Sequence, residues 1–579
     1  MKANIYILLL SFLVFSLALS QVQGAEAQLQ IVEDGKTPYR IVIGPGASPT
    51  EDFAAHELQG YIMQMSGVFL PMDRGNVPVA GKRILVGRTA VAKLRLKADE
   101  SYLGPDGFVI KTIDDKILLV GGSPRGTLYS VYTFLEMLGC RWLAPGIMGE
   151  VIPQLPNIAI APIDHTERPD IPYRGFTNYI PAIHESAQWI DWMAKSKMNY
   201  LMIPQPDYAD FKQISGGDLE RRGMEVGVSF VLEDSQPTAD QILEFIVSNP
   251  EVRIIEAQAG QLENGITSRQ LIEIEEAINQ NHPDRIAFLA ARGVKTPPAS
   301  RNIILSFDSG SRCYRHSLGD QQCEINSQVR SSFENQLELW GSAHIHEYYM
   351  GTYSQNSLPF PILHTIASDL QYFSTLNRVE AVMSQCEPGN WGTYGLNYYV
   401  FARTAWKAGV DLGIIVDDYC EKYYGSASEP MKRYFARLED AMKAMEHFSF
   451  IDPPQLILKL FDEKTLEALE TEIQNARNLA NDAMSFDRIR KTQLALEHTK
   501  LLWHTLNHYF RALQSQKAGE IKNAENHFQN AVEIGEKLVA FLFQNLDEGV
   551  FIIPEDYIFD YLEALIADAR DRKELLNTE

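Results

Sequence analysis

The stretch YRGFTN at residues 173–178 is the first of a series of short strand-like runs, and YLMIP at residues 200–204 is the second. Further short apolar runs recur at similar intervals, most of them separated by stretches with helical periodicity. This alternation predicts a (β/α)₈ barrel of the TIM type over residues 166–425. An open doubly wound sheet is the alternative, but no dinucleotide-binding fingerprint accompanies the strands. The remaining expected strands are Val226–Leu232, Val252–Gln258, Ile286–Ala291, Ile303–Asp308, His344–Tyr349 and Val379–Gln385.

The chain before the barrel, residues 25–165, is expected to form an α/β sandwich. Apolar residues at helical spacing from Phe53 to Met65 predict a helix with Thr50 as its N-cap, followed by acidic residues. A second helix is expected over Arg125–Leu138, ending at Gly139. Short apolar runs predict the strands Gln30–Val32, Tyr39–Ile43, Arg83–Val86, Gly107–Thr112 and Lys116–Gly121.

The last part of the chain, residues 426–579, is predicted to be a helical bundle. Helices over Val416–Tyr424 and Met431–His447 lead into it, and Leu466, Leu469 and Ile473 mark one apolar stripe. No fixed repeat period persists, so a solenoid is not expected. The region also lacks clusters of catalytic residue types, which leaves the barrel as the expected place for chemistry.

Charge and composition narrow the range of partners. The 579 residues include 52 Lys and Arg against 75 Asp and Glu, so the formal net charge is −23. Because a phosphate backbone is bound by a basic face, this balance argues against nucleic acid as a partner, and equally against an anionic membrane surface. Hydrophobic residues make up 45% of the chain, which excludes disordered and fibrous classes.

The amino-terminal residues predict export. Lys2 precedes an apolar run from Ile5 to Leu19, and small residues follow up to Ala25. The run is shorter than the ~20 residues of a spanning helix. The pattern is that of a Sec signal peptide, residues 1–24, with cleavage after Gly24, and it predicts a secreted or periplasmic protein. No later segment is apolar and long enough to insert into a membrane.

The cysteines and glycines predict neither a metal nor a cofactor. Five cysteines are too few for a disulfide scaffold, although Cys313 and Cys323 lie ten residues apart and are the candidate pair for one disulfide. No His/Cys cluster has the usual zinc spacing, so no metal site is expected. The glycine-rich turn over residues 121–126 lacks the Walker lysine and the Rossmann spacing, so no nucleotide cofactor is expected.

Acidic residues at the strand ends are the candidate catalytic groups, because barrel active sites form at the C-terminal ends of the strands. Glu347 ranks first, since it is a charged residue within an apolar-aromatic strand, and a buried carboxylate is costly without a partner or a task. Glu387 ranks second and Glu256 third. Two carboxyl groups of this kind are what the hydrolysis of a glycosidic bond requires.

Polar and aromatic residues near the same strand ends are the candidate substrate-binding groups. Aromatic faces stack on sugar rings, and polar side chains bind the hydroxyl groups. A carbohydrate is therefore the expected partner. The candidates are Asn178, Asp308, Arg312, His316, Tyr348, Tyr349 and Trp391.

Two parts of the chain resemble known families. The segments Gly44–Ala47, Ala55–Ile62, Ser66–Gly67 and Gly126–Tyr132 are similar to the N-terminal domain of α-glucuronidases and β-hexosaminidases, which precedes a catalytic barrel and is not itself catalytic. The segments Arg312–Asn326, Glu347–Tyr349, Glu387–Trp391, Leu396–Trp406 and Tyr423–Gly425 resemble the bacterial domain of unknown function 4838.

The second resemblance implies a secreted carbohydrate-active enzyme. Members of that family include endo-β-N-acetylglucosaminidases of glycoside hydrolase family 163, which act on N-glycans with help from the acetamido group of the substrate. Such assistance needs an adjacent pair of acids, whereas the fourth strand contains Glu256 alone.

Three hypotheses follow from these observations. The first is a glycoside hydrolase, acting on a glycan that contains N-acetylglucosamine or on another polysaccharide by carboxylate acid–base chemistry. The second is a glycan-binding protein that keeps the barrel without catalysis, because the fourth strand lacks the acid pair. The third is a scaffold whose helical C-terminal region binds proteins.

Overall fold

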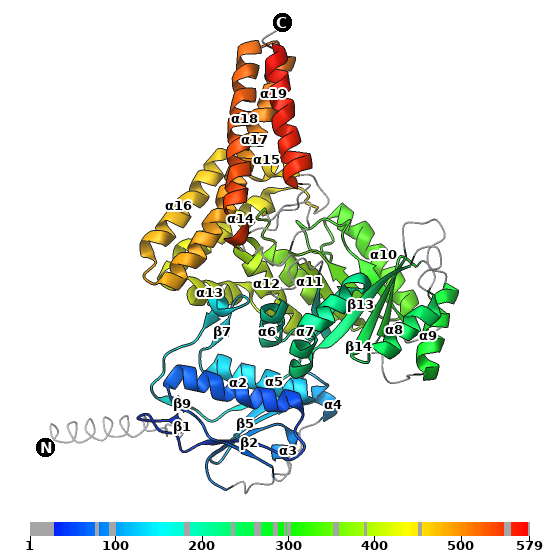
Figure 1. The fold of residues 1–579 in the computed structure, drawn as a ribbon, viewed down its shortest axis with the longest axis vertical. Helices are drawn as coiled ribbons and strands as arrows, with labels where there is room; N and C mark the ends of the chain where they lie inside the picture. Colours follow the sequence, from blue (N-terminus) through cyan, green and yellow to red (C-terminus); the bar gives the residue numbers. More distant parts are fainter. Residues whose placement is uncertain are drawn as a thin grey trace, which may run out of the picture. The chain divides into compact units, whose positions relative to one another are not determined.

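The computed structural model (Figure 1) divides the chain into two compact units, Met1–Cys140 with Ile152–Arg168 and Arg141–Val151 with Pro169–Glu579. The predicted signal peptide lies outside the described residues. The structure describes residues 28–75, 80–91, 100–178, 186–232, 238–259, 268–281, 288–294, 297, 303–350, 358–386, 391–449, 454–548, 550 and 557–576.

The first unit contains a six-stranded mixed sheet with the strand order β10-β5-β6-β4-β2-β3. β2, β3, β4 and β6 pair in parallel, whereas β5 and β10 pair antiparallel at one edge. A separate antiparallel pair joins β1 and β9. The strands are β1 (Leu29–Val32), β2 (Arg40–Ile43), β3 (Met72–Arg74), β4 (Arg83–Val86), β5 (Phe108–Ile113), β6 (Lys116–Gly121), β9 (Ile158–Ile160) and β10 (Asp164–Glu167).

Two long helices cover one face of this sheet, α2 (Pro49–Ser66) and α5 (Pro124–Met137) (Figure 1). The short α3 (Arg88–Val91) packs its Ala90 and Val91 on the other face, and α4 (Glu100–Leu103) precedes β5. The N-cap of α2 is Ser48 and not the predicted Thr50. Ser48 accepts from the amide of Glu51 while the Glu51 carboxylate accepts from the amide of Ser48, a reciprocal arrangement that satisfies two donors at once.

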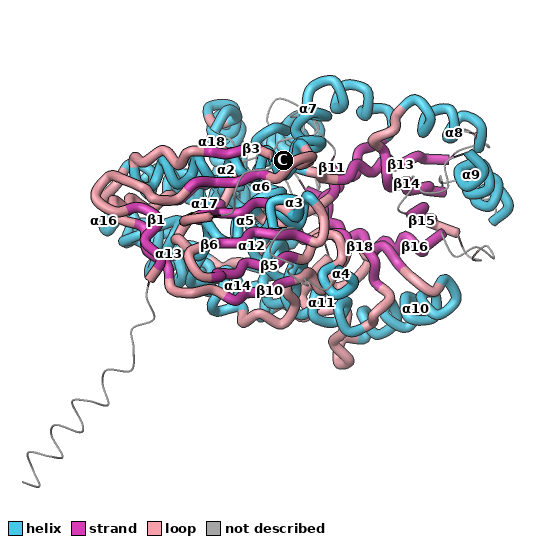
Figure 2. The backbone as a smooth tube through the Cα atoms, turned by 90° about the horizontal axis from the view of Figure 1, so that it is seen from below, coloured by secondary structure: helices cyan, strands magenta, loops and turns pink. Residues whose placement is uncertain are grey.

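The second unit is built on a closed barrel of eight parallel strands, as the sequence predicts. Figure 2 shows helices α7 to α10 outside the ring of strands. The strands are β11 (Tyr173–Asn178), β12 (Tyr200–Pro204), β13 (Glu225–Leu232), β14 (Val252–Ala259), β15 (Phe288–Arg292), β16 (Ile303–Asp308), β17 (Ala343–Glu347) and β18 (Val379–Cys386). The helices are α6 (Ser186–Lys195), α7 (Tyr208–Arg222), α8 (Ala239–Ser248), α9 (Ser268–Asn281), α10 (Glu324–Trp340), α11 (Leu363–Thr375) and α12 (Trp391–Trp406).

The part of the barrel interior nearer the N-terminal ends of the strands is a packed apolar core. Tyr200 and Met202 of β12 meet Ile254, Ala290 and other inward side chains there. The ring of Tyr200 lies against Gly175 of β11, where a Cβ atom would approach the ring to 2.7 Å. The missing side chain at Gly175 therefore leaves room for the large ring of Tyr200 in this core.

Helices complete the second unit. α13 (Leu412–Tyr424) and α14 (Ser428–Ala444) follow the barrel, and α16 (Glu463–Leu479), α17 (Ala483–Lys517), α18 (Ile521–Gln544) and α19 (Ala564–Leu576) form the predicted C-terminal bundle. α18 and α19 bury Phe528 and Ile566 in a shared core. Among the helices that the structure describes, none is long and apolar enough to cross a membrane.

Candidate active site

Strand alternation decides which side chains face the inside of the barrel. On β17, His344 points inward, because its Nε2 lies 2.9 Å from the hydroxyl of Tyr200 in the barrel core. Successive residues of a strand face opposite sides, so His346 also points inward, whereas Glu347 points outward. The same alternation places Ser306 and Asp308 of β16 on the inner face.

Four polar side chains meet on this inner face at the C-terminal ends of β15, β16 and β17. Asp308 forms an ion pair with Arg292 and accepts a hydrogen bond from the hydroxyl of Tyr348 at 3.2 Å. Arg292 also donates to the Nδ1 atom of His346 at 3.1 Å. The rings of His346 and Tyr348 stack with their centroids 4.9 Å apart. The side chain of Asp308 is 33% exposed, so this group reaches solvent.

The contacts of Asp308 favour its charged form. Its Oδ1 atom accepts the backbone N–H of Gly310 at 2.8 Å, and its Oδ2 atom accepts from Arg292 and Tyr348. Donors to both oxygens and an adjacent guanidinium stabilise a carboxylate over a carboxylic acid. Asp308 is therefore an ionised group at the C-terminal end of the barrel.

Glu256 lies one layer deeper on the inner face of β14 and is 1% exposed. Its Oε1 atom accepts from the hydroxyl of Ser306 at 2.5 Å, and its Oε2 atom accepts from the amide of Gln258 at 2.7 Å. His344 approaches the same carboxylate, with 4.0 Å between Nδ1 and Oε1. Both carboxylate oxygens are thus held by neutral donors.

The two inner histidines are neutral. Burial lowers the pKa of His344 to about 4, against the opposing charge of Glu256. Burial, assisted by the charge of Arg292, holds the pKa of His346 well below its usual value. Because Arg292 donates to Nδ1, the ring proton of neutral His346 is assigned to Nε2. That Nε2 atom is buried and has no hydrogen-bond partner among the described residues.

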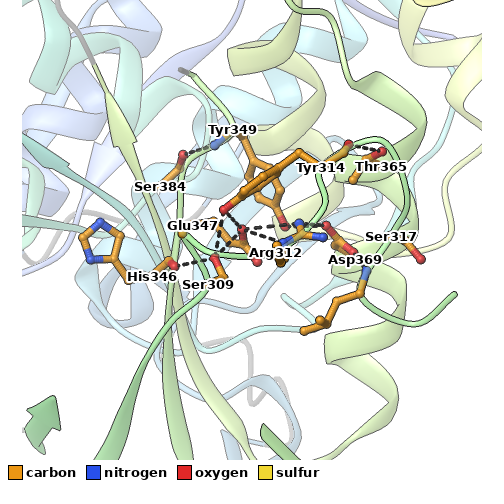
Figure 3. A network of polar contacts seen from close by, with 12 residues as sticks. Ser309, Arg312, Tyr314, Ser317, His346, Glu347, Tyr349, Thr365, Asp369 and Ser384 are labelled. Carbon is orange, nitrogen blue, oxygen red and sulfur yellow. Dashed lines mark hydrogen bonds and ion pairs between the residues drawn. The ribbon is translucent and has the colours of Figure 1, made fainter. Parts of the chain in front are cut away.

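Glu347 belongs to a different group of residues, outside the barrel wall (Figure 3). Its Oε2 atom accepts from Ser309 at 2.7 Å, from Tyr314 at 2.8 Å and from Arg312 at 3.3 Å. Arg312 also forms an ion pair with Asp369 of α11. The side chains of Arg312, Glu347 and Asp369 are all 0% exposed. Burial raises the pKa of both carboxyl groups, while the Arg312 guanidinium acts to lower them.

This placement corrects three sequence-based expectations. Glu347, the first catalytic candidate, is buried on the opposite side of β17 from His346. Arg312 is enclosed between the two carboxylates and the rings of Tyr314 and Tyr349, at 4.2 Å and 5.9 Å from their centroids. Tyr349 is 0% exposed and donates to Asp369 at 3.1 Å. These residues support the wall of the barrel and have no open face for a sugar.

The remaining candidates lie in other surroundings. Trp391 begins α12 and stacks on Tyr398 with centroids 4.6 Å apart, within a cluster that includes Trp189 and Trp192. His316 lies beside Cys313 in the segment after β16. Asn178 is the last residue of β11, but its side chain lies outside the described residues, as does Glu387. The predicted roles of Asn178 and Glu387 therefore stay predictions.

The predicted disulfide is not formed. Cys313 and Cys323 are close to each other, but both are free thiols. Gln258, Arg292 and His346 stand at predicted strand ends but are not among the site residues chosen from the sequence, and neither is Ser306. Arg292 and His346 lie in the cluster with Asp308, whereas Ser306 and Gln258 bond to the deeper Glu256. The signal that would have found them is the two-residue alternation, since each shares a strand face with a neighbouring polar candidate.

A hollow of about 680 Å³ lies elsewhere on the second unit, at the N-terminal ends of β13 and β14. Tyr208 and Phe211 of α7 and Glu251 line it, with Tyr208 bonded to Glu251. Burial and this acidic neighbour raise the pKa of Tyr208, while Lys212 and Tyr208 act to lower that of Glu251. Barrel enzymes carry out chemistry at the other end of the strands, so we do not assign the reaction to this hollow.

The comparisons with known families agree with this architecture. Residues 247–436 match the family described as "Domain of unknown function (DUF4838)", and residues 27–134 match the glycosyl hydrolase family 67 N-terminus. The chain carries a DUF4838 domain preceded by a family 67 N-terminal domain. The DUF4838 match covers strands β14 to β18 and includes all four residues of the cluster, Arg292, Asp308, His346 and Tyr348. No curated protein matches the chain.

Solved structures share the fold over most of the length of this chain. One is a GH138 enzyme targeting pectin rhamnogalacturonan II, with a TM-score of 0.61, 10% identity, and coverage of 93% of this chain and 100% of that one. A GH115 4-O-methyl-α-glucuronidase with specificity for decorated arabinogalactans has a TM-score of 0.61 at 10% identity, covering 91% and 79%. The structure of CpGH84D has a TM-score of 0.52 at 13% identity, covering 92% and 96%. At these identities the likeness establishes the fold.

Proposed function

We propose that this DUF4838 protein is a glycoside hydrolase that acts at the C-terminal end of its barrel. The observation that carries the proposal is the cluster of Asp308, Arg292, His346 and Tyr348 on the inner face, where barrel enzymes place their reacting groups. The shared fold with the GH138 and GH115 enzymes and the family 67 N-terminal match support it.

Asp308 is the proposed carboxylate that faces the sugar. Cleavage of a glycosidic bond passes through an oxocarbenium-like transition state, which a fixed negative charge stabilises. Arg292 and Gly310 hold Asp308 ionised, and a third of its side chain is exposed. The planar ring of Tyr348 beside it offers an apolar face to a sugar.

The acid that protonates the leaving oxygen is proposed to be Glu256 or Glu387. Glu256 shares the inner face with Asp308 and lies deeper in the barrel. Glu387 follows Cys386 of β18 in the sequence. Mutants identify which residue is the general acid. Its loss should slow the cleavage of substrates with good leaving groups less than that of substrates with poor ones.

A glycan-binding protein without catalysis is the second candidate. The observation that favours it is that Asp308 and Glu256 both have their two oxygens occupied by donors. Oxygens that already accept hydrogen bonds from the protein are not free to contact a glycosidic oxygen, whereas a glycosidase needs one carboxyl group that donates a proton to it.

The test is incubation of the purified protein with a panel of N-glycans and uronic-acid polysaccharides, with products analysed by mass spectrometry. We expect cleavage of at least one glycan, and we expect Asp308→Asn to lower kcat/KM by about 10² or more. Glu338→Gln, an exposed acid on α10, is the matched control and should keep the wild-type rate. Binding by calorimetry without any product would instead support the glycan-binding candidate.

We also propose that the protein is exported, on the strength of the apolar run between Lys2 and Ala25. Expression of the full chain in a Gram-negative host tests this proposal. The mature protein should begin at Ala25 and should be recovered outside the cytoplasm. An intact Met1 in the cytoplasmic fraction would contradict export.

A further inference from the structure

Four side chains with metal-binding atoms converge beside the barrel: Cys313, His316, Cys323 and His447. One ligand atom of each lies within 4.8 Å of all the others. Both cysteines are buried, with 2% of each exposed, and neither is in a disulfide. Two thiols and two imidazoles are a typical donor set for zinc in a structural site.

The measured spacing is close to that of a tetrahedral zinc site. Zinc bonds of about 2.3 Å to sulfur and 2.0–2.1 Å to nitrogen place neighbouring ligand atoms about 3.3–3.8 Å apart. The Sγ atom of Cys313 and the Nδ1 atom of His316 are 3.5 Å apart. Since all ligand atoms lie within 4.8 Å of one another, the other separations exceed this value by about 1.3 Å at most.

The backbone around the cluster is already fixed by a single side chain. Asn326, in the first turn of α10, accepts the N–H of Cys313 at 2.9 Å and donates to the carbonyl oxygens of Cys313, His316 and Ser317. Asn326 is 0% exposed. These bonds hold the backbone of two ligands of the cluster, Cys313 and His316, in place, as outer groups do around known metal sites.

The fourth ligand is brought in by a separate contact. His447 lies after α14, and the neighbouring carbonyl of Phe448 accepts the N–H of Tyr314 at 2.6 Å. Arg315 donates to the carbonyl of Lys443 at 2.9 Å. The segment after β16 is therefore bonded to the segment that carries His447 on both sides of that residue.

We propose that Cys313, His316, Cys323 and His447 form a structural zinc site. With four protein ligands the site is closed, so the metal fixes the fold and has no open position for a substrate. Each thiol releases its proton to solvent on binding, and no redox step is involved. The metal joins the segment after β16 to the segment after α14.

The full-length protein tests this proposal, purified under reducing conditions without chelator and assayed for zinc by elemental analysis. We expect about one zinc ion per chain, and Co²⁺ substitution should give the charge-transfer and tetrahedral absorption bands of thiolate ligands. Zinc should also protect Cys313 and Cys323 from alkylation, as read by peptide mass spectrometry. Absence of zinc together with full alkylation of both thiols would overturn the site.

Substitutions of single residues show which side chains bind the zinc. His447→Ala changes an exposed residue, so the protein should fold and yet retain less than a tenth of the wild-type zinc. Cys323→Ser should lose zinc as well. His56→Ala, an exposed histidine of α2, and Cys420→Ala, a buried thiol of α13, are the matched controls and should keep it. A Cys313–Cys323 disulfide in the purified protein, with equal zinc content in His447→Ala and wild type, would contradict the proposal.

Discussion

Arg312 lies between the carboxylates of Glu347 and Asp369, and none of the three side chains is exposed. Transferring three charges from water costs several kcal/mol each, and their attraction offsets this only while all partners are present. The Oε1 atom of Glu347 has no hydrogen-bond partner among the described residues, so the carboxylate depends on the donors to its other oxygen. The group is therefore sensitive to loss of the single cation.

Replacement of Arg312 should destabilise the protein more than replacement of either acid. Arg312→Met leaves two buried carboxyl groups without a cation, and we expect a loss of about 3–5 kcal/mol in the free energy of unfolding. Glu347→Gln keeps the Arg312–Asp369 pair and an oxygen for Ser309 and Tyr314, so we expect about 1–2 kcal/mol. Urea denaturation followed by fluorescence measures both.

Activity measurements distinguish a structural role of Glu347 from a catalytic one. Folded Glu347→Gln should keep kcat/KM within about tenfold of wild type, because Glu347 lies on the outer side of β17, whereas Asp308→Asn should lose about 10² or more. Full inactivation of a stable, folded Glu347→Gln protein would restore Glu347 as a catalytic residue.

For single residues, the sequence indicates which charged residues stand in apolar runs, but not which side of the strand they face. A carboxylate in the apolar run around Glu347 correctly predicts a buried charge with a partner. Its partner Asp369 lies 22 residues further on α11, and no local pattern links the two. The Cys/His cluster was missed for a similar reason, since His447 comes 124 residues after Cys323, far outside the usual zinc spacing.

Among the elements, the barrel strands follow the sequence closely. β11, β12 and β16 have the predicted bounds, and the other five differ by one or two residues at an end. Buried parallel strands are short apolar runs bounded by polar residues, which makes them visible in a single sequence. Helix starts were predicted less well: Ser48 caps α2 in place of Thr50, because the capping box with Glu51 satisfies two donors.

α17 contains a buried histidine that makes stability depend on pH. Burial lowers the pKa of His498 to about 3, whereas an unfolded histidine has a pKa of about 6.5. Below pH 6.5 the unfolded state therefore binds a proton that the native state does not, and stability falls as pH falls. Between pH 7 and pH 5 this group alone should remove about 2 kcal/mol.

His498→Gln should flatten this pH dependence. Chemical denaturation at pH 5 and pH 7 measures the difference in unfolding free energy for wild type and variant. His56→Gln, whose side chain is 51% exposed, is the matched control and should leave the slope unchanged. An identical slope in His498→Gln and wild type would contradict the assignment of the effect to His498.

Across the second unit, Arg488 of α17 joins the C-terminal helices to the rest. Its guanidinium donates to the carbonyl oxygens of Met148, Glu150 and Tyr423 and lies 4.4 Å from the ring centroid of Tyr423. Arg488 is 5% exposed. The helices after residue 450 therefore share buried polar contacts with residues that precede and follow the barrel, which argues against a freely separable C-terminal module.

Arg488→Met should lower the free energy of unfolding by about 3 kcal/mol, because buried carbonyl groups lose charged donors. Arg490→Met is the matched control two residues away, and its 41% exposed surface ion pairs should contribute about 0–1 kcal/mol. Thermal unfolding compares the two variants with wild type. Equal melting temperatures for both would show that the contacts of Arg488 contribute no stability.

The two sides of β17 carry different side chains, with His344 and His346 inside the barrel and Glu347 outside it. A shift in the register of this strand would therefore change the outer wall and the interior together. Insertion or deletion of one residue ahead of His344 would exchange the sides, turning both imidazoles outward and placing the Glu347 carboxylate on the inner face. Variation at this position is therefore restricted to substitutions. Related chains should keep the length of β17 constant even where its residues differ.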